Sequence, residues 1–170
     1  RKFCPDIILV RGDSDKYLEC TKRFLNIFKD YSPTVEVFSI DECFLEIEIK
    51  RSLHLRSWDD TIIASKLLLI ASRIKERIHK EVGEWIRCSI GISYNKQIAK
   101  LAGSLQKPDG LVAILDQTAA EMILDQGELD DICGIGSRIK RRLNNMGVFG
   151  FEQLRQVSLG DLVAAFKNHG

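Results

Sequence analysis

Residues 39–43, with the sequence SIDEC, place two adjacent carboxylates between two strand-like runs of the chain. The runs are residues 35–38 (VEVF) before the acidic pair and residues 44–47 (FLEI) after it. A partly buried carboxylate loses hydration, and two adjacent anions repel each other unless a cation or hydrogen-bond donors lie between them. The pattern predicts a β-hairpin whose turn carries Asp41 and Glu42, either as a site for Mg²⁺ or as a solvated turn without a ligand.

The remainder of the first 117 residues alternates between helical and strand-like periodicity. In chain order we expect a buried strand at 7–10, a helix at 13–30, the hairpin strands at 34–40 and 43–49, a helix at 59–79, a strand at 85–93, a helix at 95–106 and a strand at 111–115. Asp13 or Ser14 is expected to cap the first helix rather than to bind a metal. This order is the split βαβ, or ferredoxin-like, arrangement, which predicts an α+β fold with an antiparallel sheet and helices on one face.

After Asp116 the strand patterns stop, and short helical stretches alternate with glycine turns, so we expect a small all-α module. Within it, residues 132–136 (ICGIG) open a helix, as in a helix-hairpin-helix. Gly134 and Gly136 would let the backbone approach a phosphate, and the amides at the helix start would bind the anion. Cationic side chains crowd the same helix at Arg138, Lys140, Arg141 and Arg142. The motif predicts binding to a nucleic-acid backbone without base readout; an ordinary turn before a solvated basic helix is the alternative.

A further group of cations lies at Lys96, Lys100 and Lys107. Lys107 opens the turn at residues 107–110 (KPDG), directly after a predicted helix. A lysine held at this place would neutralise a triphosphate, and a solvated cationic helix end is the alternative.

Composition narrows the classes of partner. The formal net charge is +1, so any basic surface for nucleic acid must be local. No apolar run approaches the roughly 20 residues of a membrane span, and no membrane partner is expected. The five cysteines are dispersed without a C-x-x-C pair, which favours a reducing cytoplasm over a disulfide framework or a zinc site.

Together these motifs resemble those of the Y-family translesion DNA polymerases, the UmuC/DinB-like class. The run at 31–45 resembles the family's second catalytic motif, usually S-[IV]-D-E. Residues 89–102 and 107–110 are similar to its signature G-I-[SA]-x-[NT]-K-x-x-A-K-x-A…K-P-[ND]-G, and the glycine turn lies where the family's thumb begins. The resemblance implies a palm at residues 1–117 and part of a helix-hairpin-helix thumb at 118–170.

The resemblance also implies roles for single residues. Asp41 would bridge two Mg²⁺ ions, Glu42 would bind the ion that activates the primer 3′-hydroxyl, and Lys107 would contact the triphosphate of the incoming dNTP. Gly134 and Gly136 would hold duplex DNA through a phosphate, together with a monovalent cation. The implied partners are primer–template DNA, including damaged template, dNTPs, and a replication sliding clamp bound through regions outside this chain. The implied location is the bacterial cytoplasm, at the nucleoid.

The chain also departs from the family pattern. Family members begin with a strand that carries an h-D-h-D-x-F-type motif, which supplies another metal-binding aspartate and an aromatic sugar gate, and a fingers subdomain follows. Neither precedes Arg1 in this sequence, so we expect the 170-residue chain alone to have little or no polymerase activity. Two alternatives stay open: a non-catalytic DNA-binding module whose acidic pair binds no metal, and a palm-fold nucleotide cyclase, which would not need the basic glycine turn.

Overall fold

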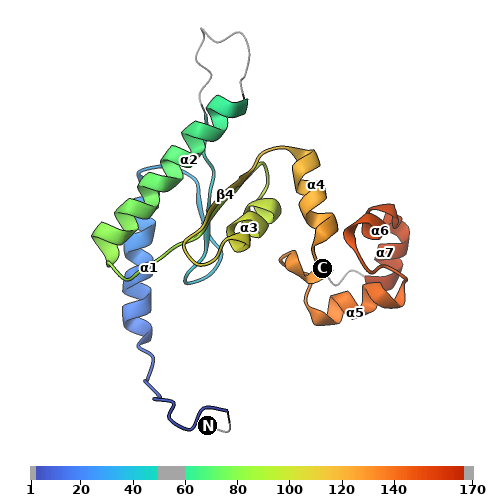
Figure 1. Ribbon diagram of the computed structural model, residues 1–170, viewed down its shortest axis with the longest axis horizontal. Helices are drawn as coiled ribbons and strands as arrows, with labels where there is room; N and C mark the ends of the chain where they lie inside the picture. The colour runs from blue at the N-terminus through green and yellow to red at the C-terminus, as the bar shows by residue number, and fades with distance from the viewer. Residues whose placement is uncertain (1–2, 50–59, 167–170) are drawn as a thin grey trace. The chain divides into compact units, whose positions relative to one another are not determined.

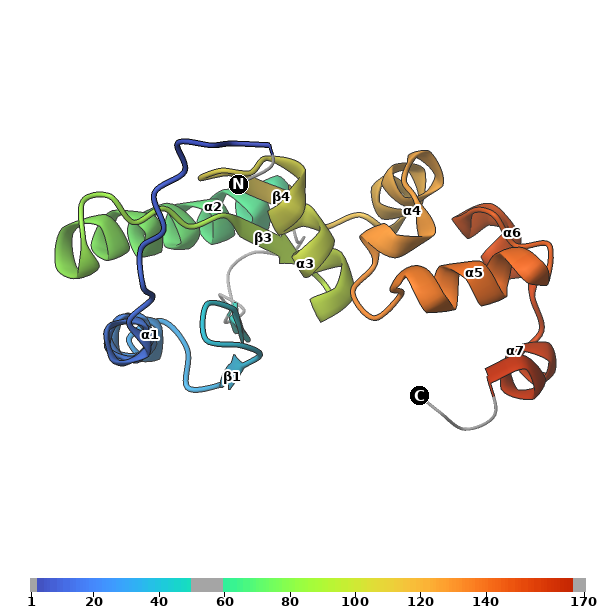
Figure 2. The ribbon, with the colours of Figure 1, turned by 90° about the horizontal axis from the view of Figure 1, so that it is seen from below.

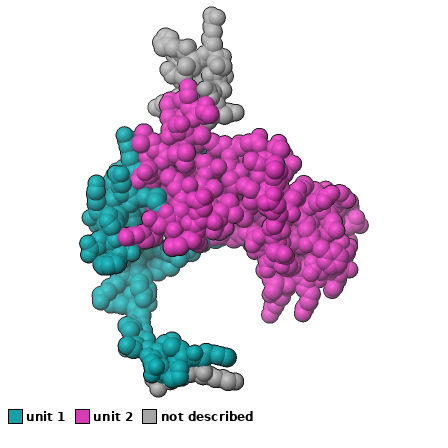
Figure 3. Space-filling model, viewed as in Figure 1, with its two compact units in different colours: residues 1–53, 73–86 teal, residues 54–72, 87–170 magenta. Residues whose placement is uncertain are grey.

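The computed structural model describes residues 3–49 and 60–166, which belong to two compact units (Figure 3). The units are defined by their contacts: unit 1 comprises residues 1–53 and 73–86, and unit 2 comprises residues 54–72 and 87–170. The division into a palm at 1–117 and a thumb at 118–170 stays a prediction.

Unit 1 begins with an extended segment and the helix α1 (Ser14–Lys29) (Figure 1). The helix and its cap are as predicted, because the Asp13 carboxylate accepts a hydrogen bond from the backbone N–H of Lys16 at 3.2 Å. The predicted strand at 7–10 is wrong: the side chains there are exposed, Ile8 at 84% and Val10 at 86%, and no described strand pairs with them. An apolar run becomes a strand only where a neighbour satisfies its backbone groups.

The hairpin follows α1 as the strands β1 (Val35–Val37) and β2 (Cys43–Leu45), which pair antiparallel. Both are shorter than predicted: β1 ends early because residues 38–42 close into a turn, and β2 begins at Cys43 as predicted but ends at Leu45. The hydroxyl of Ser32, buried to 2% exposure, lies 2.7 Å from the Glu46 carbonyl oxygen and 2.9 Å from that of Thr34, and it accepts from the Thr34 N–H at 3.0 Å. Its single proton makes the closer Glu46 oxygen the main acceptor. One side chain thus fastens the open end of the hairpin.

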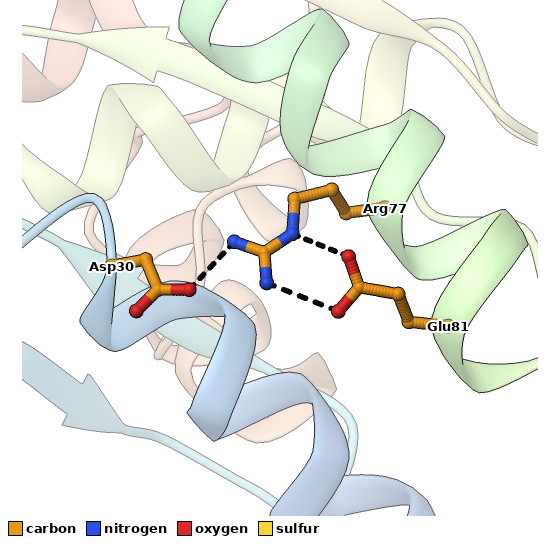
Figure 4. Close-up of polar contacts among 3 residues, drawn as sticks. All are labelled: Asp30, Arg77 and Glu81. Carbon is orange, nitrogen blue, oxygen red and sulfur yellow. Dashed lines mark hydrogen bonds and ion pairs between the residues drawn. The ribbon is translucent and has the colours of Figure 1, made fainter.

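The helix predicted at 59–79 is present as α2 (Asp60–Arg77), which continues as the π-helical segment η1 (Ile78–Val82). Its predicted first residue, Asp59, lies outside the described residues. In unit 1, the Arg77 guanidinium donates to both carboxylate oxygens of Glu81, at 2.5 and 3.0 Å, and to Asp30 at 2.7 Å (Figure 4). These bonds raise the pKa of Arg77 and lower that of Glu81, and they tie the end of α1 to the end of α2.

Unit 2 contains the strand β3 (Ile90–Ser93), the helix α3 (Lys96–Leu105) and the strand β4 (Leu111–Ile114). The two strands pair parallel, with Ile90 opposite Leu111, and α3 packs against both of them (Figure 2). The α+β class is confirmed, but the antiparallel pairing expected for the sheet is wrong for this pair. A helix that crosses over between two strands returns the chain in the same direction, which makes a parallel pair.

Strand β3 and helix α3 approach each other very closely at Gly91. A Cβ atom on Gly91 would lie 1.9 Å from the Ala99 carbonyl oxygen and 2.3 Å from the Gly103 nitrogen. Any side chain at position 91 would therefore push the helix away from the strand. Helix α3 also buries Ile98 and Ala102 in a small core shared with β4 and the next helix.

The remainder of unit 2 is helical, as predicted: no strand follows β4 among the residues that the structure describes (Figure 1). The helical segments are α4 (Gln117–Gln126), η2 (Leu129–Asp131), α5 (Ser137–Asn145), α6 (Phe151–Gln156) and α7 (Leu159–Phe166). They enclose a second core of Leu129, Leu143, Val148 and Phe151. None of the described helices has the length and apolar character that a bilayer crossing requires.

Candidate functional site

The two predicted carboxylates lie in the turn at residues 38–42, here called the carboxylate turn. The backbone N–H groups of Phe38 and Ser39 both donate to the Glu42 carbonyl oxygen, at 2.9 and 3.0 Å, which closes the turn. The Ser39 hydroxyl donates to the Asp41 carboxylate at 2.6 Å. The Asp41 side chain is exposed and that of Glu42 is half-buried. The serine supplies one donor where two neighbouring anions would otherwise repel each other.

Helix α1 holds the carboxylate turn through Thr21. The Thr21 hydroxyl lies 2.5 Å from the Ile40 carbonyl oxygen and 3.0 Å from the carbonyl oxygen of Tyr17, one turn earlier in the helix. A hydroxyl has one proton, so the shorter contact marks Ile40 as the main acceptor. The sequence shows Thr21 only as a residue of the helix expected at 13–30, and its bond to the hairpin has no local sequence signal.

The chemistry of this turn fits a small divalent cation. Carboxylate oxygens are the preferred ligands of Mg²⁺, which keeps several waters and substrate oxygens in its remaining positions. Among the described residues, no group of three or more histidine, cysteine or acidic side chains could hold a metal. The role of Asp41 and Glu42 as metal ligands therefore stays a prediction, and in the described part of the chain no third side chain of these types joins them.

Lys107 is exposed in the turn that joins α3 to β4 within unit 2. The turn is tightly built: Asp109 has a φ of 62°, and a Cβ on Gly110 would lie 2.3 Å from the Gln106 carbonyl oxygen. The Gly110 N–H also donates to the Ser89 hydroxyl at 3.1 Å, which ties the turn to the chain before β3. Lys107 thus has a fixed backbone, but the carboxylate turn belongs to unit 1, so a common site for both stays a prediction.

The predicted glycine motif forms a turn at residues 132–136, here called the glycine turn. The Ile135 N–H donates to the Ile132 carbonyl oxygen at 3.0 Å, and Gly134 has a φ of +102°. Gly136 is the N-cap of α5, and because a glycine has no side chain, none caps the first amides of the helix from this position. A Cβ on either glycine would meet nothing within 4 Å. The turn therefore presents an open backbone next to a helix start, as anion binding requires.

The four predicted cations of α5 divide into two pairs. Arg138 and Arg141 are exposed and make no ion pair with any described residue. The Lys140 ammonium is bound to Glu128 and Asp130, at 2.8 and 2.7 Å. The fourth cation, Arg142, donates to the carbonyl oxygen of Ala165, and its guanidinium lies 4.5 Å from the centre of the Phe166 ring. Two of the four cations are thus engaged inside the chain.

Comparison with known sequences places the chain in a family. Residues 1–104 match the model of the impB/mucB/samB family. The DNA polymerase IV of Clostridium perfringens (strain ATCC 13124) is 34% identical over 99% of this chain and 44% of its own length. The DNA polymerase IV of Moorella thermoacetica is 33% identical over 98% of this chain and 38% of its own length. The chain thus spans less than half the length of these relatives.

Comparison with solved structures points to the same class of proteins as the comparison with sequences. An insertion ternary complex of Dbh DNA polymerase has a TM-score of 0.77 and 26% identity over 96% of this chain and 44% of that one. The crystal structure of DinB from Sulfolobus solfataricus has a TM-score of 0.76 and 25% identity over 98% and 46% of the two chains. A Y-family DNA polymerase chimera gives a TM-score of 0.78 with 26% identity, over 96% and 44%. By these matches, and by the order of its own motifs, the chain belongs to the impB/mucB/samB family and shares its fold with Y-family DNA polymerases.

Proposed function

We propose that this chain is part of a translesion DNA polymerase, which extends a primer past damaged template bases by Mg²⁺-dependent nucleotidyl transfer. The observation that carries the proposal is the carboxylate turn, with an exposed Asp41 next to Glu42 at the tip of a hairpin. The family and its named polymerase relatives support the reaction type.

In this function, Asp41 and Glu42 would hold the two divalent cations, with Asp41 shared between them. When bound, such cations stabilise the charge on the attacking and leaving oxygens of a phosphoryl transfer. Ser39 and Thr21 would keep the carboxylates in place, because each bonds to the turn itself. Lys107 would contact the triphosphate of the incoming dNTP and offset charge that develops on it.

The same function requires a hold on primer–template DNA, including damaged template. The glycine turn and helix α5 would supply it through backbone amides and cationic side chains, with a monovalent cation at Gly134 and Gly136. A sliding clamp would bind through regions outside this chain. The function belongs in the bacterial cytoplasm, at the nucleoid, where DNA is replicated.

A non-catalytic DNA-binding module is the second candidate. It is favoured by one observation: the glycine turn has an open backbone beside the exposed Arg138 and Arg141, whereas among the described residues no third histidine, cysteine or acidic side chain joins Asp41 and Glu42. A palm-fold nucleotide cyclase has no such observation in its favour, because it makes no use of the glycine turn.

The substitution Asp41→Ala in the full-length protein separates the first two candidates. We expect primer extension with Mg²⁺ and dNTPs to fall by about 10³-fold or more, because charge stabilisation at the reacting phosphate is lost. The affinity for primer–template DNA should stay unchanged, because the glycine turn lies in another unit. The matched control is Glu48→Ala, which removes an exposed carboxylate shortly after β2.

Loss of extension and of DNA binding together would show that Asp41 is structural, and full extension would refute the metal-binding role. The DNA-binding module predicts in addition that Asp41→Ala leaves Mn²⁺ affinity unchanged. The 170-residue chain alone can be tested in the same primer-extension assay, and we expect it to extend a primer little or not at all.

A further inference from the structure

Lys140 differs from the two arginines that flank it in the basic helix. Its side chain is 25% exposed, and its ammonium turns back to the acids that precede the glycine turn. The two bonds, to Glu128 at 2.8 Å and to Asp130 at 2.7 Å, span twelve and ten residues of the chain. Lys140 therefore joins the segment before the glycine turn to the helix after it.

The acidic side of this bridge is itself rigid. The Glu128 N–H donates to the Asp131 carboxylate at 2.8 Å in a capping box, and Leu129 is fully buried in the core next to it. A Cβ on Gly127 would lie 2.8 Å from the same Asp131 carboxylate, which shows how closely the chain is folded there. The Lys140 ammonium is therefore bound to a segment that the capping box and the buried Leu129 hold in place.

The Lys140 ammonium and the carboxylates of Glu128 and Asp130 neutralise one another. Hydrogen bonds to Asp130 and Glu128 raise the pKa of Lys140, and its ammonium lowers the pKa of Asp130. A phosphate that approached Lys140 would have to compete with two carboxylates already bound to it. Arg138 and Arg141 face no such competition, since neither pairs with an acid in the described part of the chain.

We infer that Lys140, with Glu128 and Asp130, clamps the glycine turn in the shape that binds a DNA phosphate, and that Arg138 and Arg141 make the direct cationic contacts. Lys140 is then a positioning residue rather than a phosphate ligand. Arg142 likewise serves the fold, because it fastens the end of α7 to α5. The inference rests on the proposed binding of DNA by the glycine turn.

The two roles of Lys140 predict opposite effects when its acidic partners are neutralised. The double substitution Glu128→Gln and Asp130→Asn makes the protein more positive, and a phosphate-binding Lys140 would be released by it, so DNA affinity would rise. A clamp would be weakened, because a carboxamide oxygen accepts from the ammonium without the help of a negative charge. We therefore expect affinity for a primer–template duplex to fall by about 3- to 10-fold, equivalent to one or two net hydrogen bonds. The matched control, Glu152→Gln on α6, removes an exposed acid outside the clamp and should leave affinity unchanged or slightly raised.

Titration with salt tests the two arginines. Arg138→Ala and Arg141→Ala should each reduce the slope of log affinity against log salt by about 1, because each contact displaces one counterion. The clamp variant should lower affinity without that loss of slope. A rise or no change in DNA affinity in the clamp variant, or unchanged slopes in both arginine variants, would overturn the inference.

Hydrogen exchange keeps this test separate from the proposed function. In the DNA-free 170-residue chain, the amides of residues 134–137 should exchange faster in the clamp variant than in the parent chain, while those of α3 should not change. If the parent chain binds no DNA, the proposed function of the glycine turn fails. Unchanged exchange at 134–137 would refute the clamp whether or not DNA binds.

Discussion

The carboxylate turn and the glycine turn are both short connections, and each exposes the polar groups of one predicted site, yet they are stabilised by different means. The carboxylate turn presents anions, and hydroxyl groups from Ser39 and Thr21 hold it in place. The glycine turn presents backbone amides, and its shape depends on the positive φ of Gly134 and on the Lys140 bridge. A turn that gathers like charges needs donors from its neighbours, whereas a turn that offers amides needs above all the absence of side chains.

The largest effect on folding is expected at the glycine turn, where two neighbouring positions form a matched pair. A Cβ meets nothing within 4 Å at Gly134 or Gly136, but only Gly134 has a positive φ. Gly134→Ala should therefore lower the free energy of unfolding by about 1–3 kcal/mol, the cost of a strained backbone. Gly136→Ala, with a φ of −86°, should cost much less in a urea titration.

The pair also tests DNA binding. Gly136→Ala should weaken binding with the fold intact, because its methyl group would stand between the amides of α5 and a phosphate. Equal losses of stability at the two positions would show that backbone strain does not shape the glycine turn.

A smaller effect is expected at the carboxylate turn. Thr21→Val keeps the shape of the side chain but removes the donor to the Ile40 carbonyl oxygen. The free energy of unfolding should fall by about 0.5–1.5 kcal/mol, the net value of one hydrogen bond. Thr21→Ser retains the hydroxyl and should restore most of the loss, as measured by urea unfolding.

The same variant examines the site. If α1 positions the carboxylates, Thr21→Val should also weaken Mn²⁺ binding to the chain, and Thr21→Ser should not. Full Mn²⁺ affinity in Thr21→Val would confine the threonine to a role in stability.

The smallest effect is expected at the Arg77–Glu81 pair, which is the ionic counterpart in unit 1 of the Lys140 bridge. Because the folded state lowers the pKa of Glu81 below its ordinary 4.5, the pair contributes stability above pH 4.5 and loses it as the pH falls through the lower, folded value. Glu81→Gln should flatten this part of the stability profile, and the effect should be small because exposed ion pairs contribute little.

The control for that profile is Glu76→Gln, an exposed acid on the same helix. Thermal unfolding between pH 3 and 7 measures both variants. The pair has no pH-dependent role if the two profiles coincide.

Local sequence signals were sufficient for elements whose ends or turns are marked by particular residues, such as a helix cap or an acidic pair. The cap at Asp13 and the apolar spacing after it predicted α1, and the acidic pair predicted the hairpin. The apolar run at 7–10 misled, because an uninterrupted hydrophobic stretch does not reveal whether a strand will pair with it. The parallel pairing of β3 with β4 was missed, although a helix between two strands is a signal for it.

The site was predictable in type but not in detail. The sequence shows four cations on α5, but it does not show that Lys140 and Arg142 find partners far along the chain. Thr21 belongs to the packed stripe of α1, and its bond to Ile40 exists only once the hairpin lies against the helix. Such contacts depend on tertiary structure, which local patterns do not encode.

The close approach of Gly91 to α3 bears on how the family's signature is to be interpreted. Gly91 matches the signature glycine, yet the structure leaves it no space for even a methyl group between strand and helix. A glycine required at this position of the signature would thus report a packing requirement and not a chemical one. A relative that had lost the acidic pair and all catalysis would still have to keep this glycine to fold, and mutational screens that score lost activity would mistake its replacement for damage to the active site.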